Sequence, residues 1–573
     1  MRVSPPVRRW FLFGGTALTL GFASGCQYLQ FLGFLKRPVQ TGAQGRRLTE
    51  HGPAFERSRA ATGVSPDSEW RSYNHDFTTA QRHSPLTEIT PANVAALRPV
   101  CTAELGERVP MQAGPIVVAG TIYLTSAVST WALDASTCEV IWKHRYEYAP
   151  RPSYDLRVNR GVAWADTPEG GRLVRGANDG RVYALDAATG EEVWNVLAGD
   201  VAKGETFPAA PVSWGGLAYI GNAGGDNYAV TGRIMAFDVR TGATVWRAEL
   251  VPRAGERAFT WPPERDEVPR AGATTWTTYT LDTLARELFV PTGNSAPLFL
   301  PSVREGSNDH AYSVVVLDAR LGTIRQAHRI TPGDFHDWDM AAAPLLVRSK
   351  GGQSLVIAAG KDGWLHALDR ASGRRMYRTA ITTIENAEAP LTAEGTRFCP
   401  GVQGGVEWNG PSYDPARSLL FVGAVDWCTT VRVQPPAELE GKKGIPWTGS
   451  AELTEPFGKM DRKERARGWL TAVDAESGEV RWRMQAATPL VAGVTSTASG
   501  LVFTADLLGN VMAVDASTGR ELFRHNTGQP VGGGVITYVA GGRQLVAVAS
   551  GLHAPLTWQR ESAPAKVVVF GLR

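Results

Sequence analysis

Five separated stretches of the chain contain side chains of the kinds that binding and active sites use. Arg160 offers a planar, permanently charged donor fork that suits carboxylates. Trp276 offers a rigid flat face, and Asn294 an amide oxygen of the type that hard cations bind. Asp339 ends an acidic stretch, and Lys361 adds a compact positive charge. Each residue alone has an ordinary alternative as a surface, core or turn residue, so the fold must decide whether they meet.

A repeated unit is the feature of the sequence that can bring such distant stretches together. A short apolar strand ends in Asp, a turn with Thr or Ser and usually Gly follows, and a second strand begins. The Asp carboxylate can accept hydrogen bonds from the turn's N–H groups, and Gly supplies the positive φ. Because apolar residues alternate on both sides, the unit is predicted to be a β-hairpin. Its Asp residues are Asp134, Asp186, Asp238, Asp318, Asp369, Asp474 and Asp515.

An aromatic residue eight positions after each Asp predicts how neighbouring units pack. Such a ring can lie across the next unit and bury about 150–250 Å². Gln326 is the exception among these positions. The aromatic residues are Trp142, Trp194, Trp246, Tyr377, Trp482 and Phe523.

The spacing of the repeats predicts an all-β, eight-bladed β-propeller over residues 67–573. Successive Asp residues are 52, 52, 80, 51, 105 and 41 positions apart, and values near 50 fit a four-stranded blade. The two longer gaps predict blades with insertions, which usually build the site on one face. The last strand, 566–570, needs an outer neighbour, so we expect residues 97–105 to pair with it. The N- and C-terminal strands then close the ring, and seven turns plus this closing blade make eight.

The beginning of the chain predicts export. Residues 1–26 combine an Arg-containing start, an apolar stretch and Ala-Ser-Gly-Cys, as in a signal peptide with a lipobox whose Cys26 is lipidated. Arg8 and Arg9 also resemble a twin-arginine signal, and an uncleaved transmembrane anchor is the alternative. Residues 27–66 are expected to form a flexible tether. We therefore expect a lipoprotein anchored on the periplasmic side, with the outer membrane favoured over the inner one.

Composition and cysteines limit the classes of partner. The chain has 59 Lys+Arg and 56 Asp+Glu, and a net charge of +3 gives no case for nucleic acid. No CxxCH motif is present, so no covalent c-type haem is expected, and the cysteine spacing is wrong for zinc. Besides Cys26, the pairs Cys101 with Cys138 and Cys399 with Cys428 are predicted to form disulfides, with buried free thiols as the alternative.

The sequence resembles the pyrroloquinoline quinone (PQQ) dependent dehydrogenases of the methanol and alcohol dehydrogenase type. The likeness begins at 70–74 (Trp-Arg-Ser-Tyr-Asn) and 84–94 and extends over most of residues 70–573. It implies that Arg160 contacts a carboxylate of the quinone and that the cofactor stacks on Trp276. Asn294 would ligate calcium, Asp339 would be the general base and a metal ligand, and Lys361 would lie beside the reactive carbonyl.

The resemblance also implies two further site residues, each with a departure from the family pattern. Trp408 would contact the cofactor, but Glu407 stands before it where the family has Asn. Asp226 would replace the calcium-ligating Glu, in an uncertain register. Ser153-Tyr154 stands in place of a vicinal Cys pair that caps the quinone.

The stretch 331–339 that contains the expected base is not a clean match to the family. Asp337 and Asp334 are therefore alternative bases, whereas His336 is expected to be a packed residue rather than a ligand. Ala341 occupies the position where lanthanide-type relatives have an additional Asp, which favours calcium.

The resemblance implies an enzyme that oxidises a small alcohol or sugar with PQQ and calcium as cofactors. Since the chain has no haem motif, a separate cytochrome c or membrane quinone would accept the electrons. One alternative is a non-catalytic propeller lipoprotein that acts as an outer-membrane assembly scaffold, because a fold alone does not determine function. Another is a degenerate quinoprotein that holds the cofactor but has lost activity, which Asp226 and the missing Cys pair suggest.

Overall fold

The computed structural model describes residues 46–55, 66–76, 78–149, 151–153, 156–265, 267–551 and 564–572. The predicted signal peptide and Cys26 lie outside these residues. No helix in the described part of the chain is long and apolar enough to cross a membrane.

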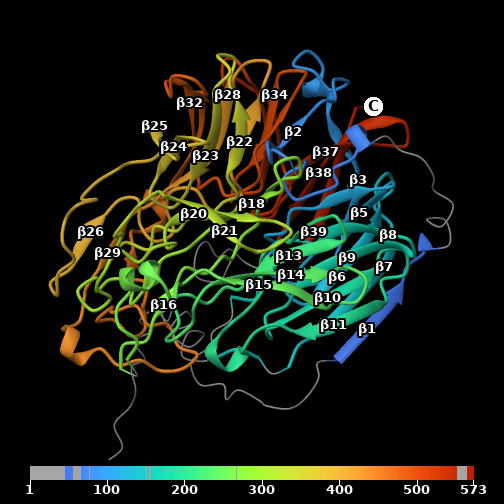
Figure 1. Cartoon of the computed structure of the whole chain (residues 1–573). Coiled ribbons are helices and arrows are strands. Elements are labelled where there is room, and N and C mark those ends of the chain that lie inside the picture. Colours follow the sequence, from blue (N-terminus) through green and yellow to red (C-terminus); the bar gives the residue numbers. More distant parts are fainter. Residues whose placement is uncertain are drawn as a thin grey trace, which may run out of the picture.

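Eight sheets, each built around four antiparallel strands, form a ring of blades (Figure 1). The first four blades are β4 (Ile116–Val118), β5 (Thr121–Thr125), β6 (Ser129–Asp134), β7 (Val140–Glu147); β8 (Ala163–Thr167), β9 (Gly170–Gly176), β10 (Arg181–Asp186), β11 (Glu192–Leu197); β12 (Val212–Trp214), β13 (Leu217–Gly221), β14 (Arg233–Asp238), β15 (Thr244–Glu249); and β17 (Thr280–Asp282), β18 (Glu287–Pro291), β20 (Ser313–Asp318), β21 (Ile324–Arg329). The next three are β22 (Leu345–Arg348), β23 (Ser354–Ala359), β24 (Trp364–Asp369), β25 (Arg375–Ala380); β27 (Ser412–Asp414), β28 (Leu419–Asp426), β31 (Arg467–Asp474), β32 (Val480–Ala486); and β33 (Thr495–Thr497), β34 (Leu501–Ala505), β35 (Asn510–Asp515), β36 (Glu521–Asn526). The predicted eight-bladed propeller is confirmed.

The eighth blade closes the ring by combining the two ends of the described chain. Its strands are β37 (Val535–Ala540), β38 (Arg543–Ser550), β39 (Lys566–Gly571) and, outermost, β3 (Arg98–Glu104). β3 and β39 pair antiparallel from Arg98 opposite Gly571 to Glu104 opposite Lys566. In Figure 1 the blue β3 accordingly lies beside the red C-terminal strands. The predicted pairing of residues 97–105 with the last strand is therefore confirmed.

Smaller elements are added to this ring. The insertions carry two sheets, β16 (Ala271–Gly272) with β19 (Ser295–Ala296), and β26 (Thr396–Phe398) with β29 (Thr429–Val431) and β30 (Lys459–Met460). Short 3₁₀ helices are η1 (Pro66–Ser68), η2 (Val94–Ala96), η3 (Val201–Lys203), η4 (Glu256–Thr260), η5 (Pro436–Glu438) and η6 (Lys463–Arg465).

The repeat turns have the predicted chemistry. In the second blade, Asp186 Oδ1 accepts hydrogen bonds from the backbone N–H groups of Ala188 and Thr189, both at 3.0 Å. Gly190 has φ +74°, and a Cβ there would lie 2.6 Å from the ring of Trp142. Trp142 belongs to the preceding blade and is fully buried, so the absence of a side chain at Gly190 lets one blade pack closely on the next.

The packing of an aromatic residue on the next blade recurs around the ring. Trp142 Nε1 also donates a 3.0 Å hydrogen bond to the carbonyl oxygen of Ala187. The corresponding contacts are Trp194 to Val239, Trp246 to Ala319, Tyr377 to Ala475 and Trp482 to Ala516, at 2.9–3.1 Å. The prediction that blades pack through these aromatic residues is confirmed.

Both predicted disulfides are present. Cys101 on β3 is joined to Cys138, which replaces the glycine of the first repeat turn, and Cys399 is joined to Cys428 in the insertion of the sixth blade. The first of these links the closing blade to the first blade, so it holds the ring together where the two ends of the propeller meet.

Two N-terminal strands attach to the ring. β1 (Arg46–His51) pairs antiparallel with β7 and becomes a fifth, outermost strand of the first blade. Residues 46–51 were expected in a flexible tether, and this expectation is wrong for them because β7 offers an open edge for backbone pairing. β2 (His83–Ser84) pairs parallel with β33, the first strand of the seventh blade.

Candidate active site

All seven predicted site residues line one cavity. They come from seven loops that are far apart in sequence, and each loop follows either the second or the fourth strand of a blade. Because consecutive strands are antiparallel, these loops emerge on one face of the ring and the Asp-containing repeat turns on the other. The residues are Arg160, Asp226, Trp276, Asn294, Asp339, Lys361 and Trp408.

Asp339 lies at the centre of a hydrogen-bond network. Its Oδ1 accepts from the backbone N–H of Asn294 at 2.6 Å, and its Oδ2 accepts from Trp276 Nε1 at 2.8 Å. The residue is 4% exposed. Two donors from different loops therefore fix the orientation of this carboxylate at the cavity wall.

Lys361 supplies positive charge at the same wall. Its Nζ lies 3.0 Å from Asp337 Oδ2, 3.7 Å from Asp339 Oδ2 and 5.6 Å from the centre of the Trp276 ring. Burial alone would lower the pKa of Lys361, but Asp337, Asp339 and Glu407 together raise it above its ordinary value. The lysine is therefore charged and neutralises part of an acidic cluster.

The other acidic groups of the cavity hold protons more tightly than carboxyls in water. Burial, and then the charge of Asp339, raise the pKa of Asp226 to about 6, although Lys361 and a hydrogen bond from Asn294 act in the opposite direction. Burial also raises the pKa of Asp337 well above its usual range, against the effect of Lys361. Such a cluster of crowded carboxyls attracts a cation, which would relieve their mutual repulsion.

Arg160 contacts two indole rings. Its guanidinium carbon is 4.6 Å from the ring centre of Trp276 and 5.2 Å from that of Trp408. One guanidinium nitrogen donates to the carbonyl oxygen of Trp276 at 3.1 Å, whereas the buried Nε has no hydrogen-bond partner among the described atoms. A buried, charged donor without a full set of partners suits an anionic ligand.

The insertion of the sixth blade builds a wall of the cavity. The backbone N–H of Trp447 donates to the carbonyl oxygen of Asp226 at 2.6 Å, which joins this insertion to the loop of the third blade. Phe457 from the same insertion lines the cavity. Met460 and Ala466 pack with Trp408 in one apolar cluster.

Asp334 does not line the cavity, although it was an alternative for the base. Its Oδ2 accepts from the backbone N–H groups of His336 and Trp338, both at 3.0 Å, and its Oδ1 lies 2.9 Å from His336 Nδ1. The His336 ring stacks on Trp338 at 4.2 Å, so His336 is a packed residue as expected. Asp334 thus shapes the turn that presents Asp337 and Asp339 to the cavity.

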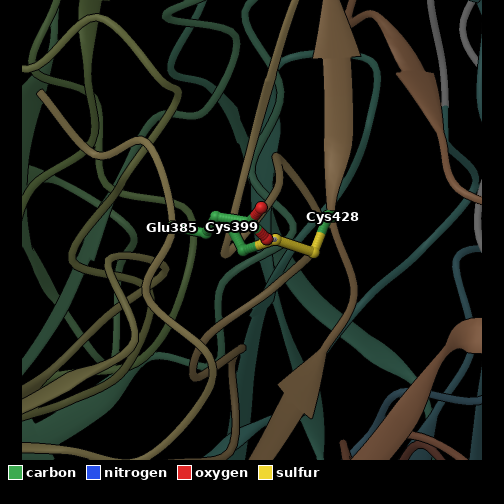
Figure 2. A group of neighbouring side chains, drawn as sticks. All are labelled: Glu385, Cys399 and Cys428. Carbon is green, nitrogen blue, oxygen red and sulfur yellow. Dashed lines mark hydrogen bonds between the residues drawn. A yellow bond between two sulfur atoms is a disulfide. The ribbon is translucent and has the colours of Figure 1, made fainter. Parts of the chain in front are cut away.

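A second group of potential metal-binding side chains lies in the insertion of the sixth blade. Glu385, Cys399 and Cys428 come close together there, but Figure 2 shows that the two sulfur atoms are joined in a disulfide. Disulfide sulfurs are not thiolates, and metal binding by cysteine needs the thiolate. Glu385 is instead paired with Arg397 at 2.8 Å.

Comparison with known proteins identifies the family. The model of the glucose/ethanol/alcohol dehydrogenase β-propeller domain, the PQQ domain, matches residues 70–390 and 378–546. The chain belongs to this family of PQQ-dependent dehydrogenases. It is thus an enzyme of the quinoprotein alcohol dehydrogenase type, and the scaffold alternative loses its support.

Individual relatives agree with this family. The chain is 29% identical to a quinohemoprotein alcohol dehydrogenase of Comamonas testosteroni, with 88% of this chain and 77% of the relative covered. It is also 29% identical to the quinoprotein alcohol dehydrogenase PedH of Pseudomonas putida, with 82% and 84% covered. The solved structure of the Comamonas testosteroni enzyme superposes with a TM-score of 0.76 at 26% identity, over 96% of this chain and 84% of that one.

The residues of this PQQ-dependent dehydrogenase fit the cofactor and a hard cation. Arg160 Nε is buried and lacks a partner among the described atoms, which suits a carboxylate of PQQ. Asp226, Asn294 and Asp339 bring oxygen atoms to one cavity, which suits calcium. Tyr154, which stands in place of the family's capping cysteine, lies outside the described residues.

Glu407 is a cavity residue that the sequence motifs did not assign to the site. Glu407 lines the cavity, and burial raises its pKa to about 6, although Lys361 and Arg160 oppose the shift. The signal that could have identified it was its position next to Trp408, where the family has Asn.

Proposed function

We propose that this protein is an exported, PQQ- and calcium-dependent dehydrogenase that oxidises an alcohol-type substrate. The observation that supports it most is that seven residues predicted from separate stretches line a single cavity in a chain of this family. In this proposal, Asp339 and Lys361 act in the reaction, while Arg160, Trp276 and Trp408 hold the cofactor.

Asp339 is proposed to accept the proton of the substrate hydroxyl. Its carboxylate is held by the hydrogen bonds from Asn294 and Trp276, so it is pre-oriented for proton transfer. When bound, PQQ supplies the electrophilic quinone that accepts the hydride. Lys361 places positive charge 3.7 Å from Asp339 Oδ2, where it stabilises negative charge in the reacting region.

Asp226, Asn294 and Asp339 are proposed to hold calcium. All three offer oxygen ligands. Burial, and then the charge of Asp339, raise the pKa of Asp226 to about 6, and a divalent cation would stabilise its ionised form. Cation binding should therefore compete with protons and weaken as the pH falls below about 6.

The remaining parts of the proposal concern location and electron transfer. The signal peptide and lipobox predicted from residues 1–26 support export and anchoring through a lipidated Cys26 on the periplasmic side, with the outer membrane favoured. Because the chain has no CxxCH motif, the electrons would leave to a separate cytochrome c or a membrane quinone. The similar methanol dehydrogenase subunit of Paracoccus denitrificans is named for cytochrome c, which supports the first acceptor.

Reconstitution tests the proposal. Purified residues 36–573 are incubated with PQQ and Ca²⁺, and bound quinone is detected from its absorption spectrum after gel filtration. Dye-linked oxidation is then measured with alcohols, sugars and aldehydes. We expect cofactor uptake and turnover of an alcohol, and we expect EDTA to abolish turnover until Ca²⁺ is restored.

Asp339→Asn is the matched variant, because it keeps the shape of the side chain and removes the base. It should fold and bind PQQ but lose at least about 100-fold in turnover, since general-base catalysis contributes about 10²–10⁴-fold. Unchanged turnover would contradict the assignment of Asp339, and a folded wild-type chain that takes up no PQQ would contradict the proposed function.

A further inference from the structure

Glu407 is a charged group of the cavity that the proposed chemistry leaves without a role. It is partly exposed to the cavity next to Trp408. No hydrogen bond or ion pair holds its carboxyl group within the part of the chain that the structure describes. By contrast, Asp339 accepts two hydrogen bonds, and Asp337 is paired with Lys361 at 3.0 Å.

Three charged groups from three other loops act on Glu407. Lys361 and Arg160 favour its ionised form, whereas Asp339 and, above all, burial favour its protonated form. The net effect raises the pKa of Glu407 to about 6. Glu407 in turn favours the charged state of Arg160, so the two groups interact electrostatically.

The cavity has few cationic side chains for an anionic ligand. Its carboxyl groups are Asp226, Asp337, Asp339 and Glu407, and its basic groups are Arg160 and Lys361. Lys361 is already paired with Asp337. Among the side chains, Arg160 is therefore the cation left to receive a carboxylate, and an ionised Glu407 offsets its charge.

We propose that Glu407 makes the binding of an anionic ligand, here the tricarboxylate PQQ, depend on the uptake of one proton by its own carboxyl group. The inference rests on the proposed function. An ionised Glu407 repels a ligand carboxylate at short range in a low-dielectric cavity. A protonated Glu407 removes this repulsion and becomes a hydrogen-bond donor, as an amide would be in its place.

Linkage sets the size of the effect. If the bound ligand keeps Glu407 protonated, the dissociation constant rises tenfold for each pH unit above the pKa of the free protein, which is about 6. Between pH 6 and pH 8 the affinity for PQQ should therefore fall by about 50-fold.

The experiment measures PQQ binding from the quenching of tryptophan fluorescence, with saturating Ca²⁺, at several pH values from 5.5 to 8. Glu407→Gln keeps the size of the side chain and cannot ionise, whereas Glu407→Asp is the matched control that can. Asp226 titrates in the same range, but it is present in all three proteins, so the difference between slopes isolates Glu407. We expect the wild type and Glu407→Asp to lose affinity with pH, and Glu407→Gln to lose much less and to bind PQQ more tightly at pH 8.

Calorimetry in two buffers of different ionisation enthalpy provides a second readout at pH 7.5. We expect the wild type to take up about one proton more per PQQ than Glu407→Gln does. Equal pH slopes and equal proton uptake in the two proteins would overturn the inference and leave the proposed function intact. If the folded wild type binds no PQQ at any pH, both fall. If Glu407→Gln does not fold, proton uptake is measured in the wild type and Glu407→Asp alone. PQQ binding by either protein without proton uptake would then overturn the inference.

Discussion

Removing Lys361 tests how much its pairing with Asp337 contributes to the free energy of unfolding. Lys361 Nζ lies 3.0 Å from Asp337 Oδ2, and the two side chains are only 11% and 5% exposed. At an effective dielectric constant of about 20, two unit charges at this distance attract each other by about 5.5 kcal/mol. Removing one member of a buried pair destabilises a protein by about 3–5 kcal/mol, because the other charge stays buried without a partner. We expect Lys361→Met to lower the free energy of unfolding of the cofactor-free protein by this amount at pH 8.

The loss should depend on pH through Asp337. Burial raises the pKa of Asp337 and Lys361 lowers it, so the pKa of Asp337 rises further in the Lys361→Met variant. An acid whose pKa is higher in the folded than in the unfolded state destabilises the fold at every pH at which the acid loses a proton on unfolding. The penalty is therefore absent below the unfolded pKa of Asp and grows as the pH rises towards the folded pKa. The variant should be closer to the wild type at pH 5 than at pH 8.

The assay is urea and thermal unfolding followed by circular dichroism, in EDTA so that no divalent cation replaces the lysine. Wild type, Lys361→Met, Asp337→Asn and the double variant are compared at pH 5 and pH 8. The double variant should recover most of the loss, since it leaves no unpaired charge from this pair. The reasoning is refuted if Lys361→Met is as stable as the wild type at pH 8, or if the double variant is no more stable than Lys361→Met.

Three further substitutions test other contacts. Trp276→Phe keeps an aromatic face but removes the 2.8 Å hydrogen bond to Asp339. A hydrogen bond to a charged group contributes about 1.5–3 kcal/mol, so kcat/KM in the dye-linked assay should fall about 10- to 150-fold. Unchanged kinetics would show that this bond does not position the base. Trp142→Ala removes a fully buried ring between the first two blades and should lower the free energy of unfolding by about 3–5 kcal/mol, with a smaller loss in Trp142→Phe. Equal urea midpoints in the wild type and Trp142→Ala would argue against packing through the aromatic residues. Replacing Cys399 and Cys428 by Ser opens a loop with a sequence separation of 29, and the unfolding midpoint should fall by the equivalent of about 3–4 kcal/mol; an unchanged midpoint would show that this disulfide does not stabilise the fold.

The architecture was predictable because its signals are local. The turn after Asp186 and the aromatic Trp142 carry their chemistry within a few residues, and the same pattern recurs along the chain. The pairing of β3 with β39 was predictable because an open sheet edge is unfavourable. β1 was missed because its sequence, RRLTEH, lacks a period-two apolar pattern, and its pairing depends on the free edge of β7.

The site was predictable only in part, because motifs identify residues but not their electrostatic surroundings. Trp276 and Asp339 could be named from separate motifs, yet their hydrogen bond joins residues 63 positions apart. The pairing of Lys361 with Asp337 rather than with Asp339 alone depends on the shape of the turn built by Asp334. The carboxyl of Glu407 has no partner because the neighbouring loops in the described part of the chain supply none, and no local sequence pattern encodes this.

The pairing of β3 with β39 has a consequence for the order of folding. β3 precedes the first blade in the sequence, but its partner spans residues 566–571. While the polypeptide is being made, β3 has no neighbour to pair with until the final blade has emerged, so the early blades must persist as an open arc with two unprotected ends. Shielding of those ends by a chaperone during synthesis, or transport of the chain in an unfolded form, would solve the same difficulty. Deleting residues 566–571 should therefore abolish the native ring rather than merely shorten it.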